Sequence, residues 1–146
     1  MTTIVTLDIK LPGSRTDANS WCARIEVPES STLSDLHHTI QQLVEFDDDH
    51  LHEFFAGRNS RHRKVTFGAD DSRLQPNEGE GVPLSEVFPL PKNHKLYYVF
   101  DFGDSWLFEI TRRSAAKQAD RTMKYPRLVQ ETGHRPAQYP DESDEG

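Results

Sequence analysis

The sequence has almost no cysteine and no long hydrophobic run, and each absence excludes a class of protein. Cys22 is the only cysteine in 146 residues, which excludes an internal disulfide and a zinc cluster built on thiolates. The longest apolar runs, such as Leu96–Phe100, are far shorter than the roughly 20 residues of a transmembrane helix. The first ten residues lack the apolar block of a secretory signal. We therefore expect a cytoplasmic protein that does not bind membranes.

Basic residues are also scarce: 17 Lys and Arg stand against 24 Asp and Glu, which gives a net charge of −7. An acidic domain repels nucleic acid unless a local basic patch dominates. Four of the acids lie in residues 141–146, and two stretches are basic. The first contains Arg58, Arg61, Arg63 and Lys64, and the second contains Arg112, Arg113, Lys117, Arg121 and Lys124. Such runs are most often solvated, so nucleic acid is an alternative partner that we do not favour.

Several segments are clearly periodic. Residues 3–11 and 21–27 alternate apolar and polar side chains, which predicts two strands paired as an antiparallel hairpin. Residues 33–44 repeat apolar side chains at three- and four-residue spacing behind a capping box of Thr32 and Asp35, which predicts an amphipathic helix. The further strands that we expect cover residues 50–57, 65–67, 95–102 and 105–113, with a single helical turn over 84–88.

This order of elements predicts an α+β fold. One main helix packs on one face of a mixed, mainly antiparallel sheet, in a β-grasp (ubiquitin-like) arrangement. We expect a single domain over residues 1–128. Residues 129–146 hold few large apolar side chains, so we expect them to form a surface-lying, partly disordered acidic tail.

A candidate polar cluster surrounds the second predicted hairpin. Gly103 and Asp104 are expected to form its turn, which places Asp101 opposite Trp106 on a face of aromatic and aliphatic side chains. Burial of a carboxylate there is energetically unfavourable unless the group is hydrogen-bonded. It therefore either binds a ligand or metal or accepts hydrogen bonds that cap the turn. We expect the second role, because short polar residues at hairpin ends usually serve it.

Three histidines extend this cluster. His50 and His52 are one residue apart, and on a strand both imidazoles project from one face, where they can chelate a cation. His37 could add a third ligand if the helix end lies over this strand. Because two histidines do not complete a site, we expect structural histidines and no metal or other cofactor. A metal-dependent hydrolase that uses His50, His52 and Asp101 is the alternative.

Two blocks of residues resemble a known family. The first contains Trp21, Arg24, Ile25, Val27, Pro28, Thr32, Leu33, Leu36, His37, Ile40, Gln41 and residues 50–54, and the second contains Tyr98, residues 100–104, Trp106 and residues 125–127. In these blocks the chain is similar to the Ri-plasmid open-reading-frame-three-like family of plasmid and insertion-element passenger proteins. The resemblance implies an α+β domain whose role is not established. It also implies a histidine in relatives where this chain has Phe108.

The functional expectation is a non-enzymatic protein-interaction module associated with plasmids or mobile elements. No serine elbow, phosphate loop or nucleophile with a base is apparent, so we assign no catalytic residue. Tyr97, Tyr98, Phe100 and Phe102 occupy both faces of one strand, which is therefore either central or part of an interface. We expect hydrophobic residues near it to bind an unknown partner protein or a second copy of the chain.

Overall fold

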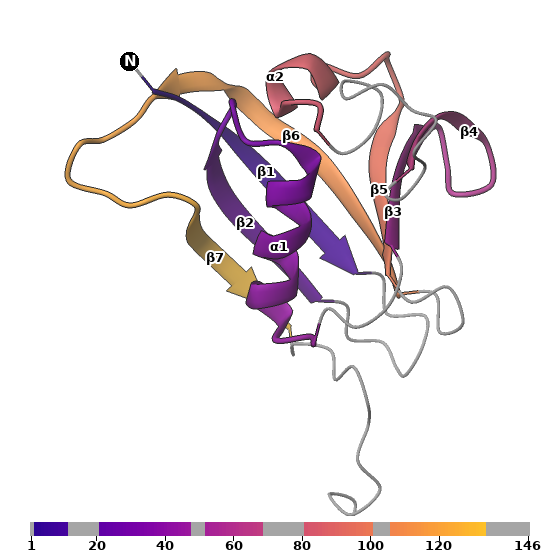
Figure 1. Cartoon of the computed structure of the whole chain (residues 1–146), viewed down its shortest axis with the longest axis horizontal. Helices are drawn as coiled ribbons and strands as arrows, with labels where there is room; N and C mark the ends of the chain where they lie inside the picture. The colour runs from indigo at the N-terminus through magenta and orange to yellow at the C-terminus, as the bar shows by residue number, and fades with distance from the viewer. Residues whose placement is uncertain (1, 12–20, 48–51, 69–80, 101–105, 134–146) are drawn as a thin grey trace, which may run out of the picture.

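Across the described residues (2–11, 21–47, 52–68, 81–100 and 106–133), this computed structural model has one antiparallel sheet of seven strands and two helices (Figure 1). The strands are β1 (Thr3–Leu11), β2 (Trp21–Pro28), β3 (His52–Gly57), β4 (Arg63–Gly68), β5 (Lys95–Phe100), β6 (Trp106–Gln118) and β7 (Arg127–Thr132). The helices are α1 (Leu33–Val44) and α2 (Leu84–Val87). No helix among these residues is long and apolar enough to span a membrane.

The strand order is β4-β3-β5-β6-β1-β2-β7, and every neighbouring pair is antiparallel. β1 and β6 are neighbours, so their pairing joins the two halves of the sheet. α1 lies across one face of the sheet, in front of β1 and β2 in Figure 1. We call that side the inner face and the opposite side the outer face.

The prediction of an α+β β-grasp is wrong. The molecule is mainly an antiparallel sheet with short helices of 12 and 4 residues, and the described strands include no parallel pair. The difference arises after α1, where five strands follow instead of three or four. β6 continues to Gln118, and β7 adds an edge strand that crosses the boundary we placed at residue 128. Residues 134–146 of the expected tail lie outside the described residues.

The first hairpin and the main helix are confirmed. β1 pairs with β2 over their whole length, from Ile4 opposite Pro28 to Leu11 opposite Trp21. The Thr32 hydroxyl accepts a hydrogen bond from the Asp35 backbone N–H at 3.1 Å, and the Asp35 carboxylate accepts from the Thr32 N–H at 3.0 Å. This capping box satisfies two backbone donors at the start of α1, where no intrahelical acceptor exists.

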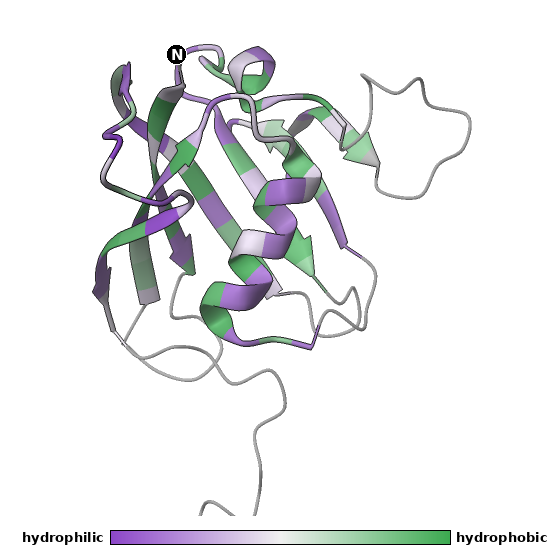
Figure 2. Cartoon of the chain, turned by 60° about the vertical axis from the view of Figure 1, so that its left-hand side comes forward, coloured by the Kyte–Doolittle hydropathy of each residue, from purple (hydrophilic) through white to green (hydrophobic). Residues whose placement is uncertain are grey.

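The hydrophobic core fills the space between α1 and the inner face. Along the strands, hydrophobic and hydrophilic residues alternate, so one side of each strand enters this core (Figure 2). The buried core residues of β1, β2 and α1 are Val5, Leu7, Ile9, Trp21, Ala23, Ile25, Val27, Leu33, Leu36, Ile40 and Val44.

The expected pairing of β5 with β6 is wrong by one residue. Trp106 lies opposite Phe100, and Leu107 lies opposite Val99. Because side chains alternate along a strand, a slip of one residue moves each of them to the other face. Trp106, Phe108 and Ile110 therefore lie on the inner face with Leu96, Tyr98 and Phe100. On the outer face, Val99 and Leu107 belong to a small cluster with Phe55 and Tyr97.

Truncation of two neighbouring side chains on opposite faces of β6 should lower the free energy of unfolding by different amounts. Phe108→Ala removes a ring that is fully buried in the core and should lower the free energy of unfolding by about 3–5 kcal/mol. Leu107→Ala removes a partly exposed side chain from the outer face and should cost about 2 kcal/mol or less. Urea unfolding of both variants measures the difference. A larger loss for Leu107→Ala would contradict this register.

Candidate functional site

Two of the predicted polar residues come together in the structure. His37 on α1 is 3% exposed, and its ring stacks on that of His52, the first residue of β3, at 3.6 Å and 6°. Trp106 is also buried but packs against Phe46 at a ring separation of 5.2 Å. The remaining members of the predicted cluster, His50, Asp101 and Asp104, lie outside the described residues.

A buried hydrogen-bond chain connects Gln41, Tyr98 and His37. The Tyr98 hydroxyl accepts from the Gln41 side-chain amide at 2.8 Å and lies 2.6 Å from Nδ1 of His37. His37, Gln41 and Tyr98 are buried, and the half-buried His52 completes this polar group between α1, β3 and β5.

The imidazole rings of His37 and His52 lie face to face. Nitrogens of two stacked imidazoles point within parallel planes, whereas ligands of one ion must converge on it. Within the described ranges, no group of three or more His, Cys, Asp or Glu side chains could hold a metal ion. Tyr98 and Gln41 were missed as members of the cluster. The spacing of His37 and Gln41, four residues apart on one helix face, is the signal that connects them.

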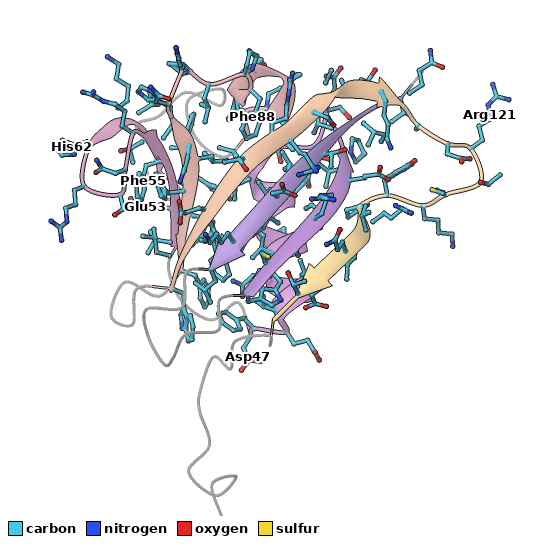
Figure 3. All side chains as sticks on the ribbon, turned by 180° about the vertical axis from the view of Figure 1, so that it is seen from behind. Asp47, Glu53, Phe55, His62, Phe88 and Arg121 are labelled. Carbon is cyan, nitrogen blue, oxygen red and sulfur yellow. The ribbon has the colours of Figure 1, made fainter. Side chains whose placement is uncertain are left out.

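The predicted basic patch lies on the β3–β4 hairpin. Arg58 and Arg61 are exposed in the connection, and Lys64 is exposed on β4, while the side chain of Arg63 is outside the described part. The Asn59 side-chain oxygen shapes the turn by accepting from the Arg61 N–H at 2.9 Å. These cations are therefore confined to one narrow tip, next to His62 in Figure 3.

A larger group of charges lies on the outer face, on the side away from α1 that Figure 3 shows. Six cations from five strands are arranged around three carboxylates, which leaves an excess of three positive charges. The cations are Lys10, Arg24, Lys95, Arg113, Lys117 and Arg127, and the carboxylates are Asp8, Glu26 and Glu109. We call these six cations and their carboxylates the cationic face.

Two carboxylates of the cationic face are each shared by two cations. The Asp8 carboxylate on β1 accepts a hydrogen bond from Nε of Arg24 at 3.0 Å and another from Nη1 of Arg113 at 3.4 Å. The pairing of β1 with β6 shifts register between Thr6 and Leu7, which makes Arg113 an extra residue. Such a bulge redirects a side chain, and here the guanidinium reaches across to Asp8.

Glu26 on β2 is the second shared carboxylate. It is only 6% exposed and pairs with Lys117 of β6 and with Nη1 of Arg127 at 3.0 Å. A buried carboxylate needs such partners, because an unpaired charge in the interior is costly. The two cations keep more exposed side chains, at 57% and 33%. Positive charge is thus presented to solvent while the negative charge stays beneath it.

The third carboxylate, Glu109, lies beside a shallow cavity of about 310 Å³. Nζ of Lys95 is 2.7 Å from Glu109 Oε1, and this hydrogen bond raises the pKa of Lys95 although partial burial lowers it. Burial raises the pKa of Tyr97, and the charge of Glu109 raises it further. Lys10 lines the same cavity, directly opposite Glu109 in the pairing of β1 with β6.

A groove separates α1 from β7 on the inner face. It consists of two hollows of about 250 and 290 Å³ that share Thr39, Gln42 and Pro126 in their walls. Leu43 and Leu128 line the first hollow, and residues of α1 and the β6–β7 connection line the second. We call this feature the α1–β7 groove.

Exposed apolar side chains lie on β7 and on the connection before it. The described residues include four exposed large hydrophobic side chains, and Met123, Leu128 and Val129 are three of them. Met123 lies in the connection between β6 and β7, which contains a turn stabilised by Asp120. The Asp120 carboxylate accepts hydrogen bonds from the Thr122 N–H at 2.8 Å and from the Thr122 hydroxyl at 2.7 Å. These bonds lower the pKa of the Asp120 carboxyl, because they stabilise its charged form.

The Tyr98 hydroxyl should contribute measurably to stability. Tyr98→Phe removes the oxygen that Gln41 and His37 share, in a buried site, and should lower the free energy of unfolding by about 1–3 kcal/mol. Tyr97→Phe is the matched control on the same strand and should change it by less than about 0.5 kcal/mol. Denaturant unfolding compares the two. Equal losses would show that the Tyr98 network is not the stabilising feature.

The outer face should lose stability in alkali. Lys95 and Tyr97 have folded-state pKa values raised above the ordinary 10.5 and 10.0, so each contributes stability below its ordinary pKa. That contribution disappears as the pH rises through the folded-state values. In a tyrosinate absorbance titration, Tyr97→Phe should remove a component that ionises late. Glu109→Gln should move that component to lower pH, and an unchanged curve would contradict the assignment.

Comparison with known proteins identifies the family but not an activity. The profile described as plasmid pRiA4b ORF-3-like protein matches residues 3–141. The uncharacterized protein y4hQ of Sinorhizobium fredii (strain NBRC 101917 / NGR234) is 30% identical over 120 residues, which cover 77% of this chain and 55% of that protein. The chain thus spans about half the length of this curated relative.

A solved structure supports the fold. The crystal structure of a protein of unknown function, MM3350 from Methanosarcina mazei Go1, superposes with a TM-score of 0.67 over 90% of this chain and 70% of the other, at 24% identity. At that identity the likeness concerns the fold alone. Because the family profile covers almost the whole chain, the chain belongs to the plasmid pRiA4b ORF-3-like family.

Proposed function

We propose that this chain is a non-enzymatic accessory module that binds another protein through the α1–β7 groove. The observation that carries the proposal is the exposed Leu128 in the wall of one of two adjoining hollows, with exposed Val129 next to it in the chain and exposed Met123 in the preceding connection. Exposed apolar groups that gather at a concave surface are typical of interaction sites.

The binding surface differs from the one that the sequence indicates. β5 is a central strand, and its aromatic residues Tyr97, Tyr98 and Phe100 are all buried within the chain. They are therefore used in this molecule's own core and outer-face cluster. Among the described residues, three of the four exposed large hydrophobic side chains lie on β7 and the connection before it, at one edge of the sheet.

The edge of the groove favours side chains of a partner over an added strand. β7 is an edge strand, but its pairing with β2 shifts register between Arg24 and Ile25, which leaves Val129 as an extra residue. A bulge of this kind interrupts the row of hydrogen-bonding groups that strand addition requires.

A single introduced negative charge can test whether the α1–β7 groove binds a partner. Leu128→Asp places a carboxylate among the apolar walls, and it should reduce partner binding at least about tenfold, because the charge loses solvation on docking. Val65→Asp is the matched control, since Val65 is the fourth exposed hydrophobic residue and lies on β4 at the opposite edge. Both side chains are largely exposed, so both variants should fold.

The measurement combines light scattering with affinity capture from the host. Light scattering detects self-association through a mass above the 16.8 kDa monomer. Affinity capture with quantitative mass spectrometry should recover a protein with the native chain and with Val65→Asp but not with Leu128→Asp. A strict monomer together with no protein that depends on Leu128 would refute the proposal.

A further inference from the structure

We propose that the cationic face binds the phosphate backbone of nucleic acid. This inference is independent of the α1–β7 groove and of protein binding there. It begins from a contrast in charge: the chain carries −7 overall, yet the cationic face groups six cations with three carboxylates. A surface of that kind is not explained by the stability of the sheet, which needs only one cation for each acid.

The distribution of charge within the face supports binding of an anion. Asp8 and Glu26 each pair with two cations. Each of these groups of three side chains therefore has a net charge of +1. Glu26 is nearly buried, whereas the side chain of Lys117 is 57% exposed. An approaching polyanion therefore meets the ammonium and guanidinium groups first. Their bonds to the carboxylates also hold three arginines in position, which lowers the entropy lost on binding.

The dimensions of the face suit a nucleic-acid backbone. From Glu109 to Lys117 along β6 is eight residues, or about 26 Å at the usual rise of a strand. From β5 to β7 is four strand spacings, or about 19 Å. Duplex DNA carries one phosphate charge for about every 1.7 Å of its axis, so a contact of this length meets enough phosphates to engage all six cations.

The chemistry of the face favours nucleic acid over a membrane or an acidic protein. Within the part of the chain that the structure describes, the exposed large hydrophobic residues are Val65, Met123, Leu128 and Val129, and none belongs to the cationic face. Membrane-surface binding usually adds apolar insertion to charge, and protein interfaces usually contain an apolar centre. No described helix crosses this side of the sheet in Figure 3, so a base-reading helix is not available here. We infer contact with the backbone, without sequence preference.

The acidic total charge does not prevent such binding. Four of the acids lie in residues 141–146, and without them the net charge is −3. At physiological ionic strength, charges more than about 8 Å apart are largely screened from one another. A phosphate in contact with Arg113 or Lys117 is therefore governed by its immediate neighbours.

The decisive variant removes three charges while each carboxylate keeps a cation. Lys10→Gln, Arg113→Gln and Lys117→Gln are combined, because Asp8 then keeps Arg24 and Glu26 keeps Arg127. Binding of a fluorescent duplex of about 20 base pairs is followed by anisotropy between about 20 and 200 mM salt. The native chain should bind, with log affinity falling linearly with log salt. The triple variant should bind at least about tenfold more weakly at low salt. Its plot of log affinity against log salt concentration should also be less steep, with a slope smaller in magnitude by about three.

A second triple variant supplies the matched control. Arg58→Gln, Arg61→Gln and Lys64→Gln change the net charge by the same amount on the exposed β3–β4 hairpin. This variant should keep native affinity within about twofold. Equal weakening by both triple variants would show that only total charge matters, and it would overturn the assignment to the cationic face.

Further outcomes bear on the nature of the ligand. Two duplexes of unrelated sequence should bind equally, and a strong preference for one would contradict backbone contact. Absence of binding at the lowest salt would refute the proposal, as would tighter binding to vesicles with about one third anionic lipid than to the duplex. Leu128→Asp should leave nucleic-acid binding unchanged, so this experiment can fail or succeed independently of the proposed protein-binding groove.

Discussion

The pairing of β1 with β6 is the contact on which the rest of the structure depends. It joins the β2–β7 side of the sheet to the β5–β3–β4 side, and the sheet is continuous only through it. It is also irregular, with register shifts on either side of Thr6. One of these shifts turns Arg113 toward Asp8 on the outer face. The same contact therefore completes the hydrophobic core and arranges the charges behind it.

Local patterns in the sequence were sufficient for most of the elements but not for their assembly. The strands at 3–11 and 21–27 and the helix at 33–44 are recognisable because their side chains alternate or recur within a few residues. The length of β6, the existence of β7 and the place of β5 between β3 and β6 depend on contacts far apart in the chain. A slip of one residue between β5 and β6 was enough to place Asp101 instead of Phe100 opposite Trp106, because no local feature fixes that register.

The same distinction explains which surfaces could be predicted. The basic run at 58–64 is visible in the sequence because its members are neighbours, and the structure leaves it at one hairpin tip. Lys10, Arg24 and Lys95 belong to no basic run and become part of one surface only through strand pairing. In the buried cluster, the proximity of His37 to His52 was anticipated as a condition for a metal site. The partners that define its chemistry, Tyr98 and Gln41, were not, because each looks like an ordinary core or helix residue in isolation.

The two proposed surfaces meet at β7. Leu128 and Pro126 line the α1–β7 groove on the inner side, while Arg127 reaches Glu26 on the outer side and also lines one hollow of the groove. Because side chains of a strand alternate between faces, one short edge strand can contribute to both surfaces. Arg127 is the residue common to them, since it lines one hollow of the groove and also holds the buried carboxylate of Glu26 in place.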